Sequence, residues 1–99
     1  MAEVSPSAAI ALAWAMIEGH LADAVTKVSG QPPSNSAIEN ARRLSDTERI
    51  KKEWISIIEK MQRLRNRVVY GEYPERQVSL TNAEQYAQLA RQVIVQVQN

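Results

Sequence analysis

The residue types most able to do chemistry in this chain lie together in the segment from Leu64 to Gly71. There, Arg65 and Asn66 precede Tyr70 by about one helical turn. A guanidinium is planar and permanently charged, so Arg65 can bind two oxygens of one phosphate group. A tyrosine can donate a hydrogen bond to a phosphate or stack on a base. These residues form the candidate site.

The same segment resembles a known signature, in which an arginine and a polar residue, often asparagine, are followed by three further residues and a histidine. This is the signature of the HEPN family, compact helical domains of bacterial toxins, antiviral systems and RNA-processing proteins. The order of the helices also resembles that family over nearly the whole chain, with Trp14 and Glu18 in the first helix and a proline-rich turn after it. Only the Arg-Asn segment is specific to the family.

The resemblance implies a metal-independent ribonuclease site without a cofactor, in which two copies of the motif meet across a dimer interface. Arg65 would hold the scissile phosphate, Asn66 would position it, and Tyr70 stands where the family has a histidine acid or base. Histidine has an ordinary pKa of about 6.5 and tyrosine of about 10, a handicap of roughly 4 to 5 kcal/mol for a base at neutral pH. We therefore expect RNA cleavage to be impaired or absent.

The position of Arg65 on its helix leaves two interpretations open. On a helical projection, Asn66 and Tyr70 face away from the apolar stripe, whereas Arg65 lies at its edge. A half-buried guanidinium needs a fixed partner, and Glu18, at the margin of its own apolar stripe, is one candidate. Alternatively, Arg65 is structural, because an arginine near a helix C-terminus interacts favourably with the helix dipole. Tyr70 could likewise only cover a helix end.

Basic residues are distributed unevenly, although the net charge of the chain is +1. Residues 42–67 contain nine Lys or Arg and four Asp or Glu, a local charge of +5. This excess could bind RNA, with Arg63 and Arg67 beside the motif and Tyr73 as a further stacking surface. It could also be an ordinary solvated helix face, since acidic residues interrupt it.

The remaining residues that could do chemistry give weaker signals. His20 is the only histidine and has no second ligand-type residue at metal spacing, so we expect neither a catalytic role for it nor a metal site. Trp14 and Trp54 both lie in apolar stripes, and we expect them in the core.

The first half of the chain predicts a long and a short helix. Ser5-Pro6 caps a helix over about residues 6–28, in which apolar residues recur every three or four positions. The turn-forming residues 29–34 connect it to a short helix over about residues 36–44.

Two capping boxes predict where the last two helices begin. Ser45 and Glu48 would open the longest helix, which Gly71 would end in the left-handed conformation. The apolar stripe of this helix would run from Ile50 to Val68, with the acid-base pairs Glu48/Lys52 and Glu59/Arg63 on its solvated side. Thr81 and Glu84 would open the last helix, which reaches about residue 98.

The predicted fold class is therefore all-α, a HEPN-like up-and-down helical bundle of three long helices plus one short helix. It forms a single domain over residues 1–99 with a flexible N-terminus of about residues 1–5. The composition, 44% hydrophobic and 23% charged, is ordinary for a globular domain.

The composition also suggests a location and partners. No cysteine is present, and the apolar run Ala8 to Met16 is too short to span a bilayer and lacks signal-peptide flanks. We expect a cytoplasmic protein without membrane association, and a homodimer formed around the motif-bearing ends of the last two long helices. RNA is the candidate ligand. The alternative is a non-catalytic dimerisation or protein-interaction module of a bacterial protein.

Overall fold

The computed structural model describes residues 5–71 and 79–98, and these form four helices and no strand. The all-α prediction, with three long helices and a short one, is confirmed. The predicted flexible N-terminus falls largely on residues 1–4, which lie outside the described residues, as does Tyr73. The helices are α1 (Pro6–Ser29), α2 (Ala37–Asp46), α3 (Lys52–Val69) and α4 (Leu80–Gln98).

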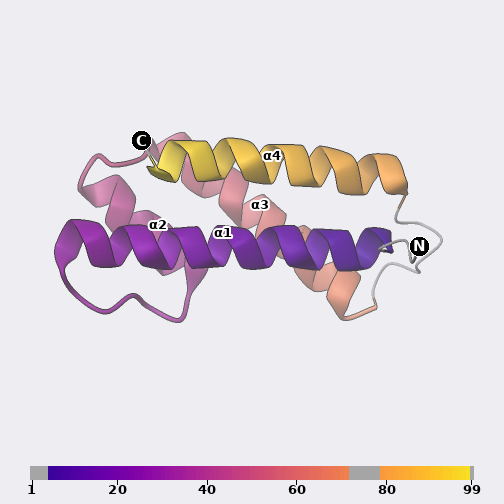
Figure 1. Cartoon of the computed structure of the whole chain (residues 1–99), viewed down its shortest axis with the longest axis horizontal. Helices are drawn as coiled ribbons and strands as arrows, with labels where there is room; N and C mark the ends of the chain where they lie inside the picture. Colours follow the sequence, from indigo (N-terminus) through magenta and orange to yellow (C-terminus); the bar gives the residue numbers. More distant parts are fainter. Residues whose placement is uncertain (1–4, 72–78, 99) are drawn as a thin grey trace.

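The three long helices alternate in direction along the chain (Figure 1). α1 and α4 lie side by side and run in the same direction, while α3 returns behind them at an angle. The contact between α1 and α4 is the most extensive in the bundle, and that between α3 and α4 is much smaller. The short α2 packs against both α1 and α3.

α1 supplies the centre of the core. Ile10, Trp14, Ile17 and Leu21 are almost completely buried, because they share one face of the helix at spacings of three and four residues. Trp14 is thus a core residue as predicted, and Trp54 is half-buried and packs against the same core.

Both ends of α1 agree with the prediction to within one residue. The Ser5 hydroxyl accepts a hydrogen bond from the Ala8 amide at 3.1 Å, and Gly30 ends the helix with a φ of 71°. Among the described helices, α1 is long and apolar enough to cross a membrane by length and composition. The whole helix meets this test, whereas the apolar run Ala8 to Met16 within it is too short to do so. Buried helices of soluble proteins meet the same test, and 39% of its most apolar window is buried here.

The predicted capping box at Ser45 is wrong. Ser45 is buried inside α2, Thr47 is the C-terminal cap of that helix, and Glu48 has a φ of 61°. The turn at Glu48 directs Ile50 into the core, so the chain leaves α2 later than the sequence suggested and α3 begins only at Lys52. The pair Glu48/Lys52 therefore does not lie on one helix.

The start of α4 also differs from the prediction. The hydroxyl of Ser79, rather than that of Thr81, accepts a hydrogen bond from the Asn82 amide at 3.0 Å. The Ala83 amide donates to the Ser79 carbonyl, so α4 begins two residues earlier than the second capping box implied.

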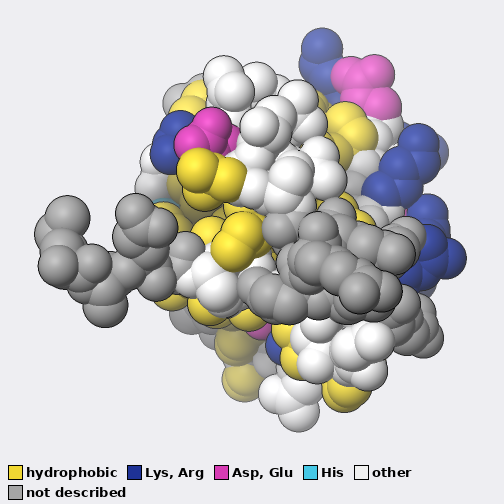
Figure 2. Space-filling model, turned by 90° about the vertical axis from the view of Figure 1, so that its right-hand side faces the viewer, with side chains coloured by type: hydrophobic (Ala, Val, Ile, Leu, Met, Phe, Trp, Pro, Cys, Tyr) yellow, Lys and Arg dark blue, Asp and Glu magenta, His cyan; other side chains and the backbone are white. Residues whose placement is uncertain are grey.

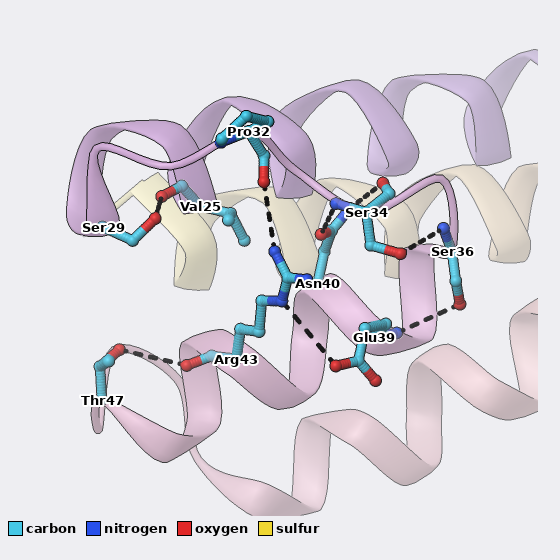
Figure 3. A network of polar contacts seen from close by, with 9 residues as sticks. All are labelled: Val25, Ser29, Pro32, Ser34, Ser36, Glu39, Asn40, Arg43 and Thr47. Carbon is cyan, nitrogen blue, oxygen red and sulfur yellow. Dashed lines mark hydrogen bonds and ion pairs between the residues drawn. The ribbon is translucent and has the colours of Figure 1, made fainter.

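The connection between α1 and α2 is fixed by a buried asparagine (Figure 3). Asn40 is 2% exposed, and its amide group accepts from the Ser34 amide at 2.8 Å and donates to the Ser34 carbonyl at 2.9 Å. Arg43 donates to the Pro32 carbonyl at 3.2 Å. These bonds hold the proline-containing turn against α2, which in turn supports the core side of α1 and α3.

Candidate functional site

The motif occupies the last turns of α3. Tyr70 is the C-terminal cap residue, its amide donates to the Asn66 carbonyl at 2.9 Å, and its side chain is 74% exposed. Gly71 follows with a φ of 78°, so the predicted left-handed end of the helix is confirmed. Asn66 is half-buried.

Arg65 lies in the middle of the buried face of α3, not at its edge. The fully buried residues of this helix are Ile58, Met61 and Val68, and a 3.6-residue period places Arg65 among them. The sequence projection placed Arg65 at an edge because it counted Ile57 and Leu64 as fully part of the buried stripe, whereas both are half-buried. As a result, the stem of Arg65 is directed towards the bundle and the side chain is half-buried.

The guanidinium of Arg65 is incompletely satisfied. One terminal nitrogen donates to Asn66 Oδ1 at 2.9 Å, while the buried Nε has no hydrogen-bond partner. Such a buried donor without a partner destabilises a fold by about 1 to 3 kcal/mol. Arg65 is therefore an unfavourable residue for the stability of the bundle.

Glu18 does not form an ion pair with Arg65. Its side chain is exposed on α1, and the ion pairs present among the described residues are Lys27–Asp23 and Arg43–Glu39. The predicted pair Glu59/Arg63 is likewise not formed. Glu18 and Arg65 both act on the pKa of Tyr86, in opposite directions.

Tyr86 is a polar residue that the sequence did not single out. Its hydroxyl is buried and donates to the carbonyl of Met61 at 3.0 Å, which joins α4 to α3 one turn before Arg65. Burial raises the pKa of Tyr86, the positive charge of Arg65 lowers it by a smaller amount, and Glu18 adds to the rise. Tyr86 is therefore neutral at physiological pH. The sequence feature that could have identified Tyr86 is that it is the only tyrosine in the apolar stripe of α4.

The outer face of α3 carries the exposed members of the motif region. Arg63, Arg67 and Tyr70 are all exposed and recur at four- and three-residue spacing, so they lie along one stripe. Lys60 is exposed one turn earlier, at the side of this stripe. Seen from the end of the bundle where α3 ends, Lys and Arg side chains gather along one side of the molecule (Figure 2).

Arg65 and Tyr70 point to different sides of α3. Two side chains five positions apart on a helix are turned by about 140° relative to each other and lie about 7.5 Å apart along the helix axis. The stem of Arg65 is directed inward, but its guanidinium is bonded to Asn66, which precedes Tyr70 by one turn and lies on the same side of the helix as Tyr70. The motif thus has an inner part, the stem of Arg65, and an outer part formed by Asn66 and Tyr70.

Arg65, Asn66 and Tyr70 line neither of two hollows of the described surface, although Leu64 and Val68 of the same segment line the larger. The larger, of about 590 Å³, is an apolar groove between α3 and α4, lined among others by Ile57, Leu64 and Leu89, and none of the three motif residues lines it. The smaller is lined by His20, which lies 3.4 Å from the Gln98 amide at the C-terminal end of α4. His20 is thus at the opposite end of the bundle from Tyr70.

The function of this chain has to be inferred from its fold and from the geometry of the motif. Comparison with models of protein families, with curated proteins and with solved structures finds no match to this chain. A functional assignment therefore depends on the side chains described above.

Proposed function

We propose that this chain is a HEPN-like helical domain that binds RNA through the outer face of α3 and cleaves it weakly or not at all. The observation that carries the proposal is the exposed stripe of Arg63, Arg67 and Tyr70 on one side of the motif helix. Two guanidinium groups about one turn apart are suited to successive backbone phosphates, and an exposed phenol supplies a stacking surface for an unpaired base.

Weak or absent cleavage follows from two features of the motif. A tyrosine stands at the position of the acid or base, and an unperturbed tyrosine is about 3 pKa units above neutrality. The stem of the candidate phosphate ligand, Arg65, is directed inward, its Nε is buried, and a terminal nitrogen is already bonded to Asn66, so less of the guanidinium is open to a phosphate. Binding by the outer stripe requires neither the inner arginine nor a base.

The experiment compares two double variants with the same loss of charge. Arg63→Gln with Arg67→Gln removes the proposed contacts, whereas Arg42→Gln with Arg91→Gln removes exposed arginines of α2 and α4. We expect the first pair to weaken binding of single-stranded RNA by at least about tenfold and the second pair by much less. An equal loss of RNA affinity in the two double variants would show that binding depends only on overall charge, and would contradict a defined binding face.

Cleavage is tested on the same RNA without added metal. The proposal expects no cleavage by the unmodified chain and none by Tyr70→His, because Arg65 remains turned inward. Cleavage gained by Tyr70→His and lost again on adding Arg65→Ala would identify a complete but silenced ribonuclease site and would refute the non-cleaving assignment.

A second candidate function, a non-catalytic interaction module, is favoured by a different observation. Leu12 and Met16 are exposed large apolar residues on successive turns of α1, away from the motif. Such a module needs no affinity for RNA. Absence of RNA binding at low salt, in a chain that is folded by circular dichroism, would select this candidate over the first.

A further inference from the structure

The solvent-facing side of α1 has an unusual composition for an exposed helix. Ala8, Leu12, Ala15, Gly19 and Ala22 recur at alternating spacings of four and three residues, which is the heptad spacing of a helix-packing seam. All of these residues are exposed except Ala22, which is half-buried. The whole first half of the helix, from Pro6 to Ile17, contains no charged residue.

Large apolar side chains stand on this seam without a partner in the bundle. Leu12 is 62% exposed and Met16, beside it, is 49% exposed. A helix that is apolar on all sides is normally buried on all sides. The outer side of α1 therefore has the composition of a contact surface.

Gly19, one of the residues of this seam, is a further indication of a close contact. It lies in the middle of a 24-residue helix and does not have a positive φ, so the backbone does not require glycine there. A β-carbon at this position would meet no heavy atom within 4 Å. Alanine would favour the helix over glycine, so the isolated bundle gives no reason for this glycine. Glycine does allow another helix to approach closely.

We propose that a second copy of this chain packs against the outer side of α1, with the two α1 helices antiparallel. With the two-fold axis at Ala15, Ala8 lies opposite Ala22 of the second copy, and Leu12 lies next to Gly19 of the second copy. The largest side chain of the seam thus meets the position without a side chain, which is the self-complementarity that a two-fold interface requires.

The charge distribution of α1 favours the antiparallel orientation of the two copies. A parallel pair would place Glu18 against Glu18 and Asp23 against Asp23. In the antiparallel pair the charged C-terminal half of each α1 faces the uncharged half, Pro6–Ile17, of the other. Like charges then do not meet across the interface.

This interface differs from a dimer around the motif-bearing ends of the long helices. α1 lies at the front of the bundle in Figure 1 and α3 at the back, so the proposed contact leaves the outer face of α3 accessible on both copies. The proposal is therefore independent of RNA binding, and its failure would leave the RNA proposal standing.

Sedimentation velocity over a series of protein concentrations tests the contact. We expect the unmodified chain to form dimers, and Leu12→Glu and Gly19→Gln each to weaken self-association by at least about tenfold. Val95→Glu, at an exposed valine of α4, is the matched control and should not change it. A chain that is monomeric at every concentration, or a dimer that is insensitive to Leu12→Glu, would overturn the proposal.

Cross-linking tests the orientation, because the chain contains no cysteine of its own. Ala15→Cys lies at the proposed two-fold axis and should cross-link efficiently with a short bis-maleimide. Thr26→Cys, on the same side of α1 but far from the axis, should not, and efficient linkage at Thr26→Cys would indicate a parallel pair and exclude the antiparallel one. Binding of a monomeric chain to phosphatidylcholine vesicles that is lost in Leu12→Glu would instead assign this face to a lipid bilayer.

Discussion

Replacing Arg65 by methionine should stabilise the bundle. Methionine keeps the length of the apolar stem, which lies among Ile58, Met61 and Val68, and removes a buried Nε that has no partner. Relief of an unsatisfied buried donor gains about 1 to 3 kcal/mol, and loss of the hydrogen bond to Asn66 subtracts about 0.5 to 1.5 kcal/mol. The expected net change is a gain of about 1 kcal/mol.

Urea unfolding followed by circular dichroism measures this change. For a domain of this size, 1 kcal/mol corresponds to a rise in Tm of about 4 to 8 °C. Arg63→Met, at an exposed arginine of the same helix, is the control and should change the free energy of unfolding by less than about 0.5 kcal/mol. A loss of about 1 kcal/mol or more on Arg65→Met, with the control unchanged, would show that Arg65 is a stabilising structural residue and would refute this reasoning.

Two further substitutions test the polar contacts that hold the helices together. Asn40→Ala should lower the free energy of unfolding by about 2 to 3 kcal/mol, because it removes both hydrogen bonds to the Ser34 backbone. Asn35→Ala, at an exposed asparagine, is the control and should have little effect. Equal urea midpoints for the two variants would contradict the role of this contact. In the folded chain the pKa of Tyr86 is raised, so as pH rises above about 10 this tyrosine ionises in the unfolded chain before it ionises in the folded chain, and the free energy of unfolding falls. Tyr86→Phe removes this group and should therefore reduce the loss of stability above about pH 10. The exposed Tyr70→Phe should retain the alkaline loss measured by thermal unfolding, and identical pH profiles for all three proteins would show that Tyr86 does not contribute.

The helices that the sequence predicted most accurately have strong local signals. α1 begins after a serine-proline cap and ends at a glycine, and both signals act within one or two residues of the helix end. The glycine at the end of α3 was equally informative, because its left-handed conformation is confirmed at Gly71. Periodic burial in α1 also identified Trp14 as a core residue.

The sequence failed where tertiary contacts compete with local signals. Ser45 has the form of a helix cap, but it is buried in α2, and burial of Ile50 sets the following turn. The buried face of α3 is also narrower than its apolar stripe, because Ile57 and Leu64 are only half-buried, and this difference concealed that Arg65 lies within the buried face. The contact between Tyr86 and Met61 joins residues far apart in the chain, so no local pattern could predict it.

The central claim, RNA binding through the outer face of α3, is tested most directly by the salt dependence of binding to the unmodified chain. Contacts from Arg63 and Arg67 to about two phosphates of single-stranded RNA predict a slope of log K against log salt of about −1.4. A measured slope between about −1 and −2 that approaches zero in the Arg63→Gln, Arg67→Gln variant would agree with this account. No binding at low salt, or a slope unchanged by that double substitution, would contradict it.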